Sequence, residues 1–245
     1  MGVIFRLIPM STLSRPHMKL ESAPRVRARA RVLAVWPAAL LLASCAALCL
    51  PGLAGAQLAS PSPPVLLEAP GRTVAGVSFP GAQLLGDAPL SLRGVGVRAK
   101  MIIKVYAAGL YLPPQQAVQD PTEVPQLACA HRLQLVMLRD VDGPRMSDGL
   151  AHAMLEGLDE AHAQAIRARV QELAQALLAH GDVHRGDVIW VDYRPERGTR
   201  VSIGGQAVTP DIAGGDFNAA MTGMWLGAHA PDAKLRAALV GQTEP

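Results

Sequence analysis

The stretch that decides the fold lies at residues 94–113 and reads GVGVRAKMIIKVYAAGLYLP. Residues 101–112 are rich in β-branched and aromatic side chains and two prolines follow, so we predict a long strand that ends at Leu112. Gly94 and Gly96 predict a break or bulge before that strand. Because side chains alternate along a strand, six residues share one side of it: Ile102, Lys104, Tyr106, Ala108, Leu110 and Leu112.

A cation and a phenol, Lys104 and Tyr106, interrupt this otherwise apolar row. The mixture suits an amphiphilic ligand with an anionic or phenolate head and an apolar body. Arg98 shares the side if the strand continues unbroken, but eight residues at about 3.3 Å each separate it from Tyr106 by about 26 Å. Both can touch one ligand only if the chain bends between Arg98 and Met101 or a bulge folds it back. A second interpretation stays open, with Lys104 solvated, Tyr106 half-buried in the core and Arg98 in a surface ion pair.

Strands come in blocks along the rest of the chain. Alternating side chains predict further strands at residues 73–79, 90–93, 131–139, 187–194, 199–203 and 206–208. A turn is predicted at residues 87–89 (Asp-Ala-Pro).

Two helices lie between the strand blocks. Asp142 is the predicted N-cap of the first, ahead of an apolar stripe at i, i+4, i+8 and i+12: Met146, Leu150, Met154 and Leu158. The second ends at Gly181, and two more are predicted at residues 217–226 and 233–239. Blocks of strands and helices favour an α+β fold with a largely antiparallel sheet over a doubly wound one.

Charge and composition exclude several function classes. The 245-residue chain has a net charge of +3, yet its first 56 residues hold seven of the 23 Lys and Arg and one of the 20 Asp and Glu. The remainder is therefore acidic, with 16 bases against 19 acids. That balance, with 4% aromatic residues, argues against a nucleic-acid partner. No phosphate-binding glycine loop, nucleophile elbow or metal-binding His pattern occurs, so no metal or organic cofactor is implied.

The first 56 residues have the pattern of a secretory signal. Basic residues 25–31 precede an apolar run at 32–50, and Ala54 and Ala56 fit the small-x-small cleavage pattern. A transmembrane anchor and a lipobox that would leave a lipidated Cys45 are the two alternatives. We divide the chain into the signal (1–56), a Pro-rich linker (57–71) and one domain (72–245), and expect export to the periplasm or cell envelope. Cys129 would then be the lone thiol, acting as a buried small hydrophobe.

The run at residues 94–113 resembles the signature strand of the chalcone isomerase family, and most closely its secreted bacterial branch. Three shorter runs are similar to other parts of the family pattern: GVSFP at 76–80, MLRD at 137–140 and WLG at 225–227. The resemblance implies an open-faced β-sandwich. In that fold a large antiparallel sheet is covered by a layer of helices, with a ligand cleft between them.

The family's chemistry implies roles for two residues. Its enzymes close a hydroxychalcone to a flavanone, holding the substrate's phenolate near an arginine and stabilising an enolate through hydrogen bonds. Arg98 matches that arginine. Tyr106 falls where the plant enzymes place a threonine that orders a water, and the fatty-acid-binding members have tyrosine there.

Other family positions differ in this chain. An alignment without gaps puts the catalytic tyrosine on Met146 and an asparagine on Ala153, and neither residue can donate to a phenolate or carbonyl. Thr209 is the candidate for the family's last threonine.

Three hypotheses follow from these matches. The first is an exported protein that binds a small amphiphile, such as a fatty acid or similar carboxylate, through Arg98 and Tyr106 with Lys104 nearby. The second is an intramolecular lyase, an isomerase of the chalcone-to-flavanone type, with Arg98 and Tyr106 as catalytic residues. The third is a non-catalytic structural or partner protein of the envelope. Membrane contact is expected only through the leader or a lipid on Cys45.

Overall fold

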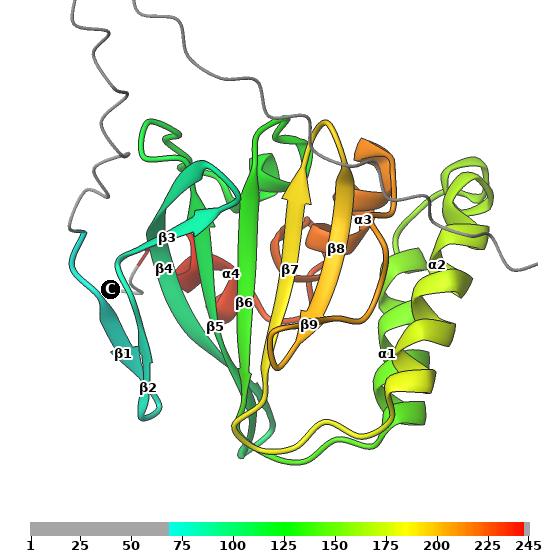
Figure 1. The fold of residues 1–245 in the computed structure, drawn as a ribbon, viewed down its shortest axis with the longest axis horizontal. Helices are drawn as coiled ribbons and strands as arrows, with labels where there is room; N and C mark the ends of the chain where they lie inside the picture. Colours follow the sequence, from blue (N-terminus) through cyan, green and yellow to red (C-terminus); the bar gives the residue numbers. More distant parts are fainter. Residues whose placement is uncertain (1–68, 243–245) are drawn as a thin grey trace, which may run out of the picture. The chain divides into compact units, whose positions relative to one another are not determined.

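A computed structural model describes residues 69–242 as a sheet covered by helices (Figure 1). Seven strands pair antiparallel in the order β3-β4-β5-β6-β7-β8-β9, and β1 pairs with β2 in a separate hairpin. The strands are β1 (Arg72–Val74), β2 (Val77–Phe79), β3 (Ala82–Leu85), β4 (Ala88–Lys100), β5 (Ile103–Leu112), β6 (His131–Met137), β7 (Val188–Arg194), β8 (Gly198–Ile203) and β9 (Gln206–Ala207). The helices are η1 (Pro121–Gln126), α1 (Gly143–Leu155), α2 (Glu160–His180), α3 (Gly215–Leu226) and α4 (Ala233–Leu239).

The predicted α+β class with a layer of helices over an antiparallel sheet is confirmed. Helix boundaries also agree with the sequence signals. The Asp142 side chain accepts a hydrogen bond from the Arg145 N–H at the start of α1, and Gly181, with φ of 89°, ends α2. The α1 stripe is shorter than predicted, since the helix ends at Leu155 and leaves Leu158 beyond it. The leader, Cys45 and most of the 57–71 linker lie outside the described residues.

Several local predictions were wrong. Residues 73–79 form a hairpin and not one strand, because Ala75 and Gly76 have positive φ angles (51° and 79°) and reverse the chain. The turn expected at residues 87–89 lies one residue earlier, at Gly86 and Asp87, and Ala88 already begins β4. Strand β3 and helix η1 were not predicted.

The decisive stretch folds into a hairpin. Strand β4 continues through Gly94 and Gly96 to Lys100, the chain reverses at residues 101–102, and β5 returns beside it. The predicted strand at 101–112 therefore starts two residues too early. The predicted irregularity is confirmed as a bulge between Leu92 and Gly94.

The two glycines of this stretch let α4 lie directly on β4. A Cβ atom at Gly94 would stand 2.0 Å from the carbonyl oxygen of Ala238, and one at Gly96 would stand 2.7 Å from Leu235 Cδ1. A side chain at Gly94 would collide with the backbone at the end of α4, and one at Gly96 would displace the Leu235 side chain. The glycines thus bring the first turn of α4 close to the β4–β5 hairpin.

The outer face of the sheet carries a closed polar network. Arg132 donates from Nε and Nη2 to the two carboxylate oxygens of Asp192, at 2.6 and 2.8 Å. Its Nη1 donates to Gln83 Oε1 at 2.7 Å, and Gln83 in turn donates to Gln134. The guanidinium also lies over the Trp190 ring, 4.8 Å from its centroid. Arg132, Gln134 and Asp192 are almost fully buried, and Gln83 and Trp190 are partly buried.

Candidate functional site

A cavity of about 600 Å³ lies between the inner face of the sheet and the helices. Its volume falls in the usual range for small-molecule sites. Most of its wall is apolar, with side chains from β6, α1 and α3: Leu135, Met137, Met146, Leu150, Met154 and Met224. The inner face of the sheet is therefore only partly filled by the helices that cover it.

Arg98 and Tyr106 line this cavity side by side. They are direct partners in the β4–β5 register, so their Cα atoms are about 5 Å apart. The separation of about 26 Å for an unbroken strand does not occur, because the chain turns back at Met101. The fold thus meets the condition that the sequence set for a shared site.

Tyr106 is held by a tryptophan from α3. The indole Nε1 of Trp225 donates to the Tyr106 hydroxyl oxygen at 2.8 Å. Burial raises the pKa of Tyr106, against the opposing effects of the Trp225 hydrogen bond and the Arg98 charge. The phenol is therefore neutral at physiological pH. Since its oxygen accepts from Trp225, the hydroxyl proton can be donated to a ligand.

Arg98 forms an ion pair with Asp232, the N-cap residue of α4. Arg98 Nη1 donates to Asp232 Oδ2 at 2.9 Å, while Asp232 Oδ1 accepts from the Leu235 N–H at 3.0 Å. Arg98 also makes a long contact of 3.4 Å to its neighbour's carbonyl, again from Nη1. Its Nε and Nη2 have no hydrogen-bond partner within residues 69–242. One edge of the guanidinium is thus available at the cavity wall.

The charges that line the cavity balance. Arg98 and Arg145 stand against Asp232 and Glu156, with His229 as the remaining titratable lining group besides Tyr106. A ligand anion would therefore be attracted by one nearby arginine and not by a net positive charge of the cavity.

The other predicted site residues have different positions. Lys104 is exposed near the start of β5, next to the β4–β5 turn, and does not line the cavity. Met146 and Ala153 do line it, so two family donor positions face the cavity with side chains that cannot donate. Thr209 is buried outside the lining, and its hydroxyl accepts from the Val201 N–H at 3.0 Å.

The sequence reasoning missed Trp225 and Asp232 as site residues. Asp232 has a readable local signal as a helix N-cap, three residues before Leu235. Nothing local connects it to Arg98, which lies 134 residues away. Trp225 lies in a run that resembles the family pattern, but nothing local connects it to the tyrosine it bonds, 119 residues away.

Within residues 69–242, no three His, Cys, Asp or Glu side chains stand close enough together to hold a metal ion. In the same part of the chain, every helix is too short or too polar to cross a membrane. Cys129 is partly buried, and this burial raises the pKa of its thiol. A protonated thiol is a poor nucleophile, which fits the packing role predicted for it.

Comparisons with known proteins give the fold an independent reference. Residues 71–241 match a family model described as chalcone isomerase-like. The crystal structure of a fatty-acid-binding protein from Arabidopsis thaliana superimposes with a TM-score of 0.57, covering 70% of this chain and 96% of that one. Sequence identity to that protein is 15%, so the likeness is one of fold. No curated protein matches the chain.

Proposed function

The chain belongs to the chalcone isomerase-like family, and we propose that it binds a small amphiphilic ligand, a fatty acid or a similar carboxylate. One observation carries the proposal. A largely apolar cavity of about 600 Å³ has on its wall, next to each other, a partly buried phenol and a guanidinium with only one of its three nitrogens hydrogen-bonded. An apolar space with a few convergent polar groups is the usual form of a small-molecule site.

The geometry suits a carboxylate head. The free edge of Arg98, formed by Nε and Nη2, matches the two oxygens of a carboxylate, and Tyr106 adds a third donor. The methionines and leucines of the wall would enclose the alkyl chain. The Arabidopsis protein of the same fold is described as fatty-acid binding, which agrees with this assignment.

An intramolecular lyase of the chalcone type has weaker support. Arg98 and Tyr106 are placed for it, but Met146 and Ala153 offer no donor from α1. A purely structural role is also disfavoured, because side chains leave the cavity open. We therefore rank ligand binding first and isomerisation second.

We also propose that the protein acts in the periplasm or cell envelope after export. The basic and apolar pattern of residues 25–56 supports this. Cell fractionation and the intact mass of the purified protein test it, with a mature chain beginning at Gln57 as the expected result. A chain that keeps its leader in the cytoplasm would refute export, and a lipid-modified mass starting at Cys45 would refute cleavage after Ala56.

The binding proposal is tested on protein purified from cells that express the full chain. Native mass spectrometry followed by organic extraction should reveal a co-purifying amphiphile, and stripped protein should take up laurate or palmitate in a calorimetric titration. Ala153→Phe should abolish uptake, because the added ring enters the cavity. His152→Phe, on the exposed side of the same helix, is the matched control and should bind normally.

Retained affinity in Ala153→Phe would place the ligand elsewhere. A clean mass and no uptake by the wild-type protein would refute binding of fatty acids. A direct assay of chalcone cyclisation would then decide between the lyase and the structural role.

A further inference from the structure

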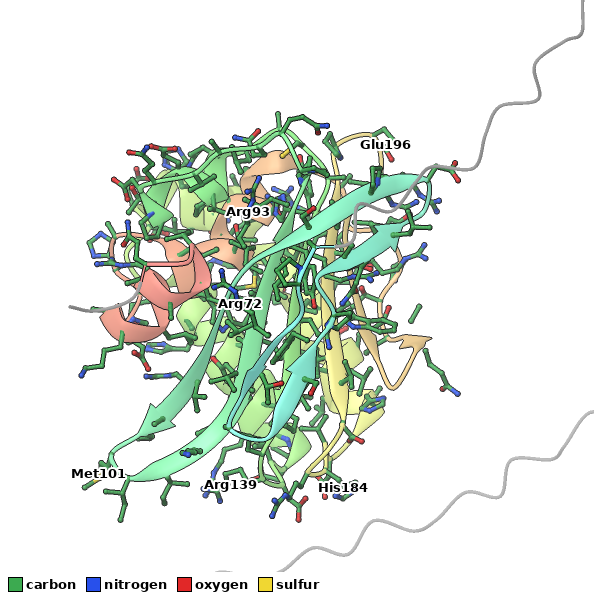
Figure 2. The ribbon with its side chains drawn as sticks, turned by 90° about the vertical axis from the view of Figure 1, so that its left-hand side faces the viewer. Arg72, Arg93, Met101, Arg139, His184 and Glu196 are labelled. Carbon is green, nitrogen blue, oxygen red and sulfur yellow. The ribbon has the colours of Figure 1, made fainter. Side chains whose placement is uncertain are left out.

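The tip of the β4–β5 hairpin exposes three large apolar side chains between two lysines. Met101 is 93% exposed, Ile102 96% and Ile103 50%. Lys100 and Lys104, both exposed, flank them. Figure 2 shows Met101 at the far end of the hairpin, projecting from the sheet. Only two other large apolar side chains in residues 69–242 are exposed, and both lie in other elements.

The backbone of this tip is strained to keep a large side chain there. Lys100 pairs with Ile103, which leaves Met101 and Ile102 as a two-residue loop. Met101 has φ of 57°, at a loop position where hairpins with one such residue normally place glycine. Solubility and turn geometry would both favour a small or polar residue. An apolar residue at a costly backbone position indicates a functional constraint.

We propose that this tip, residues 100–104, inserts into the surface of a bilayer that contains anionic lipids. Three side chains offer far less contact area than the roughly 800 Å² that each partner buries in a stable protein interface. They do suit shallow insertion at the boundary between headgroups and acyl chains. The lysines can extend their ammonium groups to the lipid headgroups while their alkyl stems follow the apolar side chains inward.

The charges around the tip favour an anionic surface. Residues 88–112, which cover the whole hairpin, contain four basic side chains and no acidic one. A further exposed cation, Arg139, follows Leu138, whose N–H donates to the Val105 carbonyl at the base of the hairpin. The neighbouring acid, Asp140, accepts from the Arg185 N–H and lies 3.6 Å from a His184 ring nitrogen. Lys100 and Lys104, with Arg139 nearby, therefore place net positive charge around the apolar residues of the tip, whereas Arg98 is paired with Asp232.

The same hairpin forms part of the cavity wall. Arg98, Val105 and Tyr106 line the cavity, and Arg98 is three residues from Met101, or about 10 Å along the strand. Insertion of the tip would thus hold the cavity close to a surface where amphiphiles are stored. The inference itself stands on the hairpin and is independent of what occupies the cavity. The sequence alone predicts membrane contact only through the leader or a lipid on Cys45, and the tip would be a further contact.

Vesicle binding tests the proposal. Sedimentation with phosphatidylcholine vesicles containing 30% phosphatidylglycerol, free of fatty acid, should show binding at least 10-fold tighter for the wild-type protein than for Met101→Gly/Ile102→Asn. That variant supplies the residues that such a turn prefers, so its fold should be preserved or stabilised. Lys100→Gln/Lys104→Gln should bind anionic vesicles no better than pure phosphatidylcholine. Leu178→Asn, which removes an exposed apolar residue of α2, is the control and should bind as wild type.

A fluorescence measurement reports the position of the tip directly. Ile102→Trp should show a blue shift on addition of anionic vesicles, whereas Leu178→Trp should show none. All variants share the same N-terminal sequence and are processed alike, so differences between them report on the tip. Equal vesicle binding by wild type and Met101→Gly/Ile102→Asn, or an unshifted emission spectrum for Ile102→Trp, would overturn the proposal. Capture of a protein through the tip without vesicle binding would overturn it as well.

Discussion

The sheet holds an arginine–aspartate pair on each of its faces, and the two pairs differ in how completely they are used. On the outer face, Arg132 meets Asp192 with two hydrogen bonds and Gln83 with a third, and stacks on Trp190. Both side chains of that pair are 11% exposed. On the inner face, Arg98 meets Asp232 with one short hydrogen bond. Here the side chains are 27% and 18% exposed.

The difference separates a structural role from a binding role. A buried guanidinium with all three nitrogens engaged has nothing to offer a ligand, and its partners fix its position. A guanidinium with one nitrogen engaged beside an open cavity can still accept a carboxylate on its free edge. Sequence composition does not distinguish the two arginines. The distinction comes from the neighbours that the fold supplies to each.

The largest expected effect is on the outer pair. Asp192→Ala should lower the free energy of unfolding by about 3–5 kcal/mol, because it leaves the Arg132 charge buried without a counterion. Urea denaturation with an unchanged m-value would measure this. The double variant Arg132→Met/Asp192→Leu should recover most of the loss, since a packed apolar pair of similar volume replaces the charges. A cost below about 1 kcal/mol for Asp192→Ala would mean that water reaches the pair.

For the inner arginine we expect the reverse, a large loss of ligand affinity and a small loss of stability. Arg98→Ala should weaken fatty-acid binding by about 1.5–3 kcal/mol, or roughly 10- to 150-fold, through loss of charged hydrogen bonds. Its free energy of unfolding should change by about 1 kcal/mol or less, because the ion pair is partly solvated. Calorimetric titration and urea denaturation give the two values. Arg185→Ala removes an exposed arginine outside the cavity and should alter neither. Equal losses of stability and binding would mean that Arg98 acts through the fold.

Much of the scaffold follows from local patterns. The alternation in residues 131–139 places Leu133 and Leu135 on the buried inner face, and both are in the core. The caps Asp142 and Gly181 mark real helix ends. Such features depend only on residues within one turn or one strand, so they can be predicted from the sequence.

The site depends on contacts that no local pattern encodes. Residues 100–103 read Lys-Met-Ile-Ile and contain no glycine, proline or asparagine, so no local signal predicts the turn that brings Arg98 to Tyr106. Pairing along β4 and β5 imposes this turn, and Met101 accepts a left-handed backbone as a result. The Asp232 contact depends in turn on α4 packing against Gly94 and Gly96.

Tyr106 lies beside Arg98 and is hydrogen-bonded to Trp225 of α3. Its substitution should lower the free energy of unfolding by less than Asp192→Ala does. Tyr106→Phe removes the acceptor of the Trp225 indole N–H, and a donor that is buried without a partner costs about 1–2 kcal/mol. Urea denaturation of Tyr106→Phe, Trp225→Phe and the double variant forms a thermodynamic cycle. The double variant should cost less than the sum of the two single variants. Additive costs would show that the hydrogen bond contributes nothing to folding.

The smallest expected effect is a gain in ligand affinity. It comes from making the same substitution, aspartate to asparagine, on each face of the sheet. Asp232→Asn keeps the α4 N-cap, since asparagine caps as well as aspartate, and removes a negative charge beside the proposed carboxylate site. Laurate affinity should therefore rise by about 1 kcal/mol, roughly fivefold, while dodecanol affinity stays the same. Asp192→Asn, the same change on the outer face, should lower stability and leave laurate affinity unaltered. Tighter binding of both ligands in Asp232→Asn would mean that the substitution opens the cavity, and an unchanged laurate affinity would mean that the ligand carboxylate does not lie at Arg98.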